Sequence, residues 1–176
     1  MSNPREAHPT AVDEEQAWRL IGEARAIDPS PEAMARHLVH VLTDAGNARH
    51  IQRFDEIFSR WMLRGYRWDL WGVSGLVSGG HGDQESFMAF RSWLISLGQE
   101  TFDKALEDPD SLAPFLVLGP SGEPLCYVAR DAYEAVEGSE LPTPTLDLFA
   151  EPHGQPIPAS DLTTQFPKIA AALGLS

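Results

Sequence analysis

The chain of 176 residues has the length of one ordinary domain, and with 43% hydrophobic and 22% charged residues its composition is globular. Its 26 acidic and 13 basic residues give a net charge of -13, which repels phosphate backbones and anionic lipids, so we expect neither a nucleic-acid nor a membrane partner. Because it has no long apolar run, no secretory signal pattern and only one cysteine, Cys126, we expect a cytoplasmic location.

Helical periodicity extends through most of the chain as far as residue 137. Residues 1–12 lack this periodicity and are expected to form a flexible N-terminus. Asp13 and Ser30 are typical residues for the start of a helix, and Gly46 and Gly98 suit helix ends. The pattern predicts five helices, near residues 13–27, 31–45, 47–65, 66–77 and 83–97.

The fourth of these helices begins with the unusual segment "YRWDLWG", residues 66–72. It is apolar on nearly every side, since Asp69 and Val73 share one face whereas Trp68 and Gly72 share another, with Trp71 beside them. Such a helix is usually central and packed against several neighbours. We therefore expect its aromatic rings mainly to build the core, and a binding surface for a partner is the alternative.

The chain after residue 98 has a more varied pattern. A short helix is expected over 99–107, and residues 115–128 either contain a small hairpin or lead into a helix over 124–136. Beyond Gly138 the proline-rich stretch "LPTPTLDLFAEPHGQPIPAS" favours an extended arm that lies over the body, followed by a short helical end. The predicted fold is a mainly α, single-domain helical bundle over 13–137, with a Pro-rich arm and terminal helix over 138–176.

Few side chains have a spacing that points to chemistry. His81 lies near Asp83 and Glu85, but a metal site needs three or four converging ligands and the other histidines do not supply them at ligand-motif spacing. "GGHG" matches neither common phosphate-binding loop. Cys126 stands in an apolar helical context that is typical of an inert buried thiol. We therefore predict no metal and no cofactor.

Asp69 and Arg91 form a more informative pair. Their helical phases place both charges toward apolar surroundings, and a buried charge needs a partner. A bidentate ion pair between the fourth and fifth helices meets that need, with Asp55 as a competing partner for Arg91. The alternative is that Arg91 remains partly unpaired at the base of a pocket and holds a carboxylate or phosphate of a ligand.

A series of motifs stands in a distinctive order: "FDEIF", "YRWDLWG", "GG", "FMAFRSWLISLGQETFDKAL" and "DPDSLA". In this combination the chain resembles the bacterial domain-of-unknown-function family 4240, which is common in actinobacteria, over residues 13–137, and the end "DLTTQFPKI" is similar to that of many members. The matching motif positions are Phe54, Asp55, Trp68, Asp69, Trp71, Gly79, Gly80, Phe87, Phe90, Arg91, Trp93, Leu94 and Gly98.

The resemblance implies no established activity. The chain departs from the family pattern after the two glycines, where "HGDQES" stands in place of a frequent cysteine–serine–aspartate run, so cysteine chemistry at that loop is excluded here.

Two functional hypotheses follow. The favoured one is a non-catalytic module that binds a protein or peptide, or regulates one, through the aromatic segment or the proline-rich arm. The alternative is a small enzyme or ligand-binding protein with a pocket between the third, fourth and fifth helices. The residues expected to bind a ligand or partner are Trp68, Asp69, Trp71, His81, Asp83 and Arg91.

Overall fold

A computed structural model of the chain describes residues 12–80, 82–116, 121–144 and 151–175. The predicted mainly α fold is confirmed, and no residue of these ranges belongs to a strand. The N-terminal helices are α1 (Glu14–Ile27), α2 (Pro31–Asp44) and α3 (Ala48–Arg64), followed by α4 (Trp68–Val77), α5 (Gln84–Ser96) and α6 (Gln99–Glu107). Their order and lengths agree closely with the predicted ranges.

Three of these helices begin at side chains that accept hydrogen bonds from the first turn. Asp13 caps α1 by accepting from the Gln16 amide at 2.8 Å. The Asn47 side chain caps α3, and Asp83 caps α5 by accepting from the Ser86 amide at 2.8 Å. Ser30 precedes α2 but its side chain makes no capping bond. Short polar side chains therefore fix the starts of α1, α3 and α5, which are half of these six helices.

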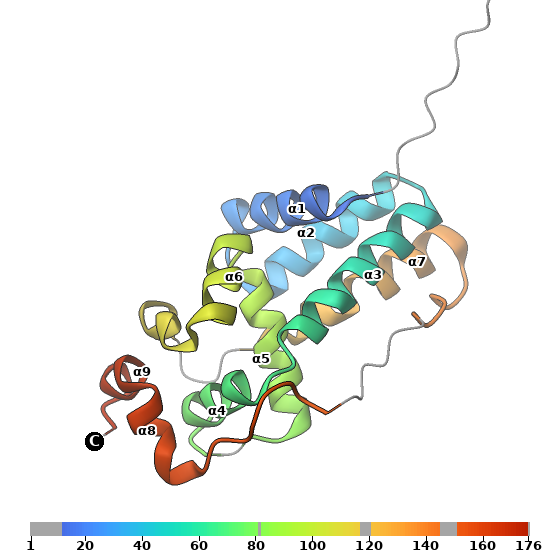
Figure 1. Cartoon of the computed structure of the whole chain (residues 1–176). Coiled ribbons are helices and arrows are strands. Elements are labelled where there is room, and N and C mark those ends of the chain that lie inside the picture. Colours follow the sequence, from blue (N-terminus) through green and yellow to red (C-terminus); the bar gives the residue numbers. More distant parts are fainter. Residues whose placement is uncertain (1–11, 81, 117–120, 145–150, 176) are drawn as a thin grey trace, which may run out of the picture.

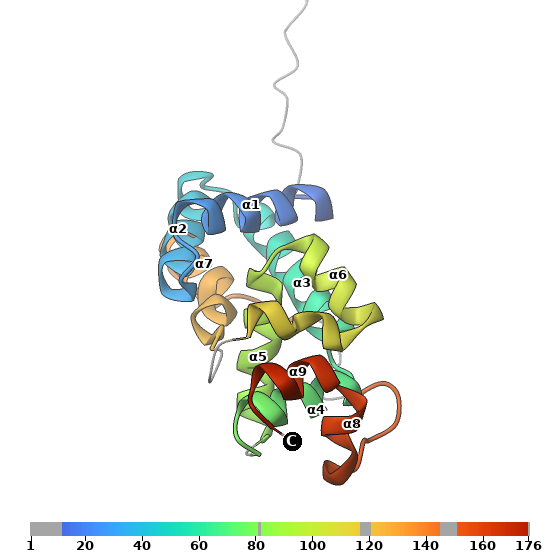
Figure 2. The same cartoon turned by 90° about the vertical axis from the view of Figure 1, so that its left-hand side faces the viewer.

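The centre of the bundle is α5 rather than α4. Figures 1 and 2 show α5 running through the molecule, with α1, α2 and α7 (Val128–Glu137) toward one end and α4 and the C-terminal helices toward the other. Every residue from Phe90 to Ser96 is buried, including Ser92 and Ser96. The prediction placed helix 66–77 at the centre because it is apolar all round, but its faces are covered by α5 and by the C-terminal segment.

Two short 3-10 helices, η1 (Pro109–Phe115) and η2 (Glu123–Tyr127), connect α6 to α7. The helix expected over 124–136 is present as η2 followed by α7. Residues 117–120, where a strand and turn were the alternative, lie outside the described residues. Gly122 packs directly against α5 through two hydrogen bonds. Its amide donates to Ala89 O at 3.0 Å, and Ser92 Oγ donates to Gly122 O at 2.8 Å.

The C-terminal segment contains η3 (Ala159–Asp161), α8 (Leu162–Gln165) and α9 (Pro167–Ala172). Of these helices, α8 packs on α4 and α9 packs on η1. His153 forms an isolated parallel bridge with Arg67, in which its amide donates to Tyr66 O at 2.9 Å and its carbonyl accepts from the Trp68 amide at 3.0 Å. These bonds engage the backbone on both sides of Arg67, which explains why α4 begins at Trp68 rather than at Tyr66.

No helix in the described ranges combines the length and the apolar character needed to cross a membrane.

Candidate functional site

The aromatic segment is an internal cluster with a partly open edge. Trp68 and Trp71 are both half-buried, and their ring centroids lie 5.5 Å apart. The Trp71 ring contacts Phe87 with centroids 4.6 Å apart, and its Nε1 donates to Gly82 O at 3.1 Å. The two rings are thus attached to the start of α5 and are neither fully buried nor a free surface.

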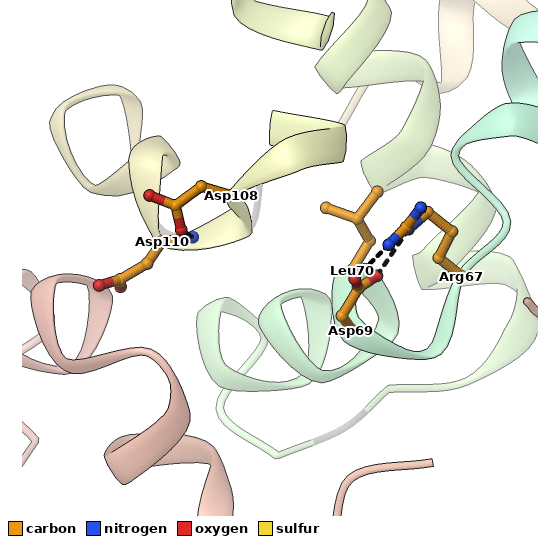
Figure 3. A network of polar contacts seen from close by, with 5 residues as sticks. All are labelled: Arg67, Asp69, Leu70, Asp108 and Asp110. Carbon is orange, nitrogen blue, oxygen red and sulfur yellow. Dashed lines mark hydrogen bonds and ion pairs between the residues drawn. The ribbon is translucent and has the colours of Figure 1, made fainter. Parts of the chain in front are cut away.

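Asp69 does not pair with Arg91, so that prediction is wrong. The Asp69 carboxylate accepts two hydrogen bonds from Arg67, from Nε at 3.0 Å and from Nη2 at 2.7 Å, and a third from the Leu70 amide (Figure 3). Because Arg67 lies only two residues away, its guanidinium reaches Asp69 within the first turn of α4. The negative charge of Asp69 in the first turn of α4 also interacts favourably with the helix dipole. These contacts give Asp69 a part in stabilising the start of α4.

Arg91 is buried, with only 5% of its surface exposed. Its guanidinium lies against two neighbouring aromatic rings, 4.6 Å from the centroid of Tyr66 and 4.9 Å from that of Phe87, whose centroids are themselves 5.9 Å apart. Nη1 donates to Met62 O at 2.7 Å, one of the carbonyls that the last turn of α3 leaves free. Nε is buried and has no hydrogen-bond partner. Burial lowers the Arg91 pKa to about 10, and the residue still carries its charge at neutral pH.

A cavity of about 650 Å³ lies beside this arginine, between α3, α5, η2 and the start of α7. Its apolar lining comes mainly from Phe58, Met62 and Met88. The segment Leu141–Pro144, which has no regular secondary structure, forms another part of the wall. A volume of this size is typical of sites for small organic ligands.

The titratable groups of the cavity wall are Asp55, Glu85, Arg91, Cys126 and Arg130. Burial, with a smaller contribution from neighbouring Glu56, raises the Asp55 pKa to about 6. Burial also raises the pKa of the Cys126 thiol, an effect that the Ser92 side chain and the Arg91 charge partly oppose. Within the described ranges no ion pair joins Asp55 to Arg91, so Asp55 is not its partner.

None of the other predicted site residues that the structure describes lines this cavity. Asp83 caps α5 with an exposed carboxylate, whose pKa is lowered by its hydrogen bonds with Ser86. His81 lies outside the described residues. Of the three described residues of the predicted pocket, Asp69, Asp83 and Arg91, only Arg91 is in the cavity wall. In the part of the chain that the structure describes, no three His, Cys, Asp or Glu side chains are grouped so as to hold a metal ion.

The sequence reasoning missed most of the cavity lining, although part of its signal is visible. Gln84, Met88 and Arg91 are spaced four and three residues apart and therefore share one face of α5. Asp55 and Met62 likewise lie one heptad apart on α3. Each stripe is visible in the sequence, but only the packing of α3 against α5 shows that they face a common space.

A family model described as "Protein of unknown function (DUF4240)" matches residues 12–135. Neither the search of curated proteins nor that of solved structures finds a match to the chain.

Proposed function

Because the chain belongs to the DUF4240 family, whose description assigns no activity, we propose a function from the site itself: a non-catalytic binding module that holds a small, mainly apolar ligand in the cavity between α3 and α5. The observation that carries this proposal is the cavity of about 650 Å³ with Arg91 in a wall that is otherwise largely apolar. Ligand sites commonly combine an apolar lining with a few convergent polar groups.

The state of the nearby reactive groups supports binding rather than catalysis. The thiolate is the nucleophilic form of cysteine, and burial raises the Cys126 pKa, which favours the less reactive thiol. Asp69 is held by Arg67, and Asp83 is held at the start of α5. The two acids that the sequence placed in the predicted pocket are therefore occupied at helix starts.

A neutral fluorescent probe, N-phenyl-1-naphthylamine, tests the proposal without involving charge. We expect saturable binding of one probe per folded chain, because the probe exchanges water for the apolar lining. Met88→Glu should abolish this binding by placing a charge in the lining, whereas Met88→Leu should retain it. Thermal melts of both variants verify folding.

Ile27→Glu is the matched control for the added charge, since Ile27 lies at the end of α1 and is 67% exposed. Probe binding that is absent in the folded wild type, or equal in Met88→Glu and Ile27→Glu, would exclude the cavity as the site.

Docking of a protein or peptide is a second candidate function, favoured by the half-buried state of Trp68 and Trp71 at the edge of α4. Amphipathic tryptophan rings of this kind often anchor partners. A candidate partner that binds wild type and Met88→Glu equally, but loses affinity for Trp68→Ala, would assign the function to this edge instead of the cavity.

A further inference from the structure

The Arg91 guanidinium is a buried charge with no carboxylate partner among the described residues. It lies against the adjacent Tyr66 and Phe87 rings and donates to one backbone carbonyl, Met62 O. Of the carboxylates in the cavity wall, neither Asp55 nor Glu85 forms an ion pair with it in the described structure. A buried arginine is normally matched by an acid, because burial of an unpaired charge is costly.

The buried Nε atom is the second observation. It has a hydrogen to donate and no acceptor in the described structure, and an unsatisfied buried donor is itself unfavourable. Nη1 already donates to Met62 O, so the Nε side of the guanidinium remains free to donate. Arginine commonly holds a carboxylate on this side with two parallel hydrogen bonds. Arg91 is part of the cavity wall, and since Nε itself is closed to solvent, a ligand acceptor in the cavity reaches it when the side chains that cover it shift.

The rest of the wall decides what else such a ligand contains. Phe58, Met62 and Met88 offer an apolar surface, and the two methionines are flexible enough to adapt to an aliphatic chain. Asp55 and Glu85 disfavour further negative charges on the ligand, and Arg130 is already paired with Asp131. The wall therefore suits one anionic group attached to an apolar body.

We propose that the cavity binds an aliphatic monocarboxylate of the fatty-acid class, with its carboxylate at Arg91 and its chain against Met62 and Met88. This assignment rests on the proposed function, because it specifies the ligand class of the same cavity.

The test compares decanoate with decanol, two ligands that share a chain and differ in charge. By displacement of N-phenyl-1-naphthylamine, we expect decanoate to bind about tenfold more tightly or better, as a charge-assisted hydrogen bond provides. The NMR signal of the Arg91 Nε–H group should shift on addition of decanoate and not on addition of decanol. Both measurements use the wild-type protein, so they do not require any variant to fold.

Arg91→Gln then removes the charge while keeping a donor for Met62 O. We expect decanoate to lose about tenfold in affinity and decanol to remain within about twofold. Arg60→Gln is the control, because Arg60 is an exposed arginine of α3 that does not line the cavity. A short apolar peptide with a free C-terminal carboxylate forms another arm of the test.

The outcomes separate the two proposals. Decanol binding as tightly as decanoate, or an unchanged decanoate affinity in folded Arg91→Gln, would overturn the carboxylate assignment while the neutral probe still reports the cavity. Tighter binding of the peptide than of decanoate would overturn the fatty-acid class. Failure of the neutral probe as well would remove the proposed function itself.

Discussion

Two regions at opposite sides of α5 each contain a buried charged side chain, and they differ in whether its hydrogen bonds are satisfied. Where η1 meets α9, Asp110 is only 6% exposed, and its carboxylate accepts from the Ile169 amide at 2.9 Å and the Lys168 amide at 3.1 Å. At the α3–α5 cavity, Arg91 is buried to the same degree but has a partnerless Nε. Burial alone therefore does not distinguish a structural charge from a candidate binding group; the number of satisfied hydrogen bonds does.

The same two regions also differ in how the space around them is filled. Gly72 lies so close to α8 that a Cβ atom there would be 2.6 Å from Leu162 Cδ2, so the C-terminal segment packs directly on α4. Figure 3 shows Asp110 on η1, close to the ribbon of this C-terminal segment. The cavity, by contrast, keeps about 650 Å³ open beside α5. Of these two described regions, only the cavity combines open space with an unsatisfied donor in a wall residue.

The largest change in the free energy of unfolding is expected at Gly122, and it tests whether the cavity arises from loose packing. Gly122 anchors η2, which carries Cys126 of the cavity wall, and a Cβ atom at Gly122 would lie 2.0 Å from the backbone N of Trp93. Backbone atoms cannot move aside as a side-chain end can, so Gly122→Ala should lower the free energy of unfolding by about 3 kcal/mol or more, as measured by urea denaturation.

Gly22→Ala is the control for this change, because a Cβ atom at Gly22 meets nothing within 4 Å. It should leave stability unchanged or raise it by up to about 1 kcal/mol, since alanine favours the helix. Equal stability of Gly122→Ala and wild type would mean that η2 can move away from α5. The cavity would then be a consequence of loose contacts and not a formed site.

A smaller effect is expected for the satisfied charge. Asp110→Ala leaves two amides at the start of α9 without their acceptor and should cost about 2 kcal/mol. The loss should be local, so hydrogen exchange of the amides of residues 168–173 should accelerate more than that of α5. Asp161→Ala serves as the control, since Asp161 is exposed and its side chain contacts Ser160. Unchanged exchange in α9 would show that Asp110 does not hold the C-terminal segment.

The sequence predicted the helices well because their starts and ends depend on local chemistry. Asp13 and Asp83 cap the helices that they precede, and Gly138 ends α7 in the left-handed conformation at φ 65°. The start of α4 was placed at Tyr66 instead of Trp68, because the bonds that engage this backbone come from His153, far along the chain. A local pattern contains no information about such a partner.

The candidate site was less predictable for a related reason. Helical phase identified Arg91 as pointing toward apolar surroundings, and this residue does lie in the cavity wall. Phase does not identify the facing residue, and Asp69 was assigned to Arg91 although Arg67, two positions away, is its partner. The sequence did not single out Phe58 or Met88, because an unfilled space between two helices leaves no trace in either helix's own pattern.

The smallest expected effect concerns the other charge of the cavity wall, Asp55. Its pKa is about 6 in the folded chain against an ordinary value of 3.8, so the folded state binds the proton more tightly than the unfolded state between these two values. Stability contributed by this group therefore falls as pH rises from about 4 to about 6, and it stays at the lower level above that range.

Asp55→Asn removes this penalty and should raise the free energy of unfolding above pH 6 by about 1–2 kcal/mol, a figure reduced from the full shift because the side chain is only partly buried. The gain should shrink as pH approaches 4, where Asp55 of the folded wild type is almost fully protonated and most of the penalty is gone. Urea denaturation across pH 4 to 8 measures it, with Asp44→Asn, an exposed acid of α2, expected to change stability by less than about 0.5 kcal/mol. If the advantage of Asp55→Asn were the same at every pH, the carboxyl would not titrate in a desolvated wall. The difference between the cavity wall and the region around Asp110, whose carboxylate has its hydrogen-bond donors, would then depend on Arg91 alone.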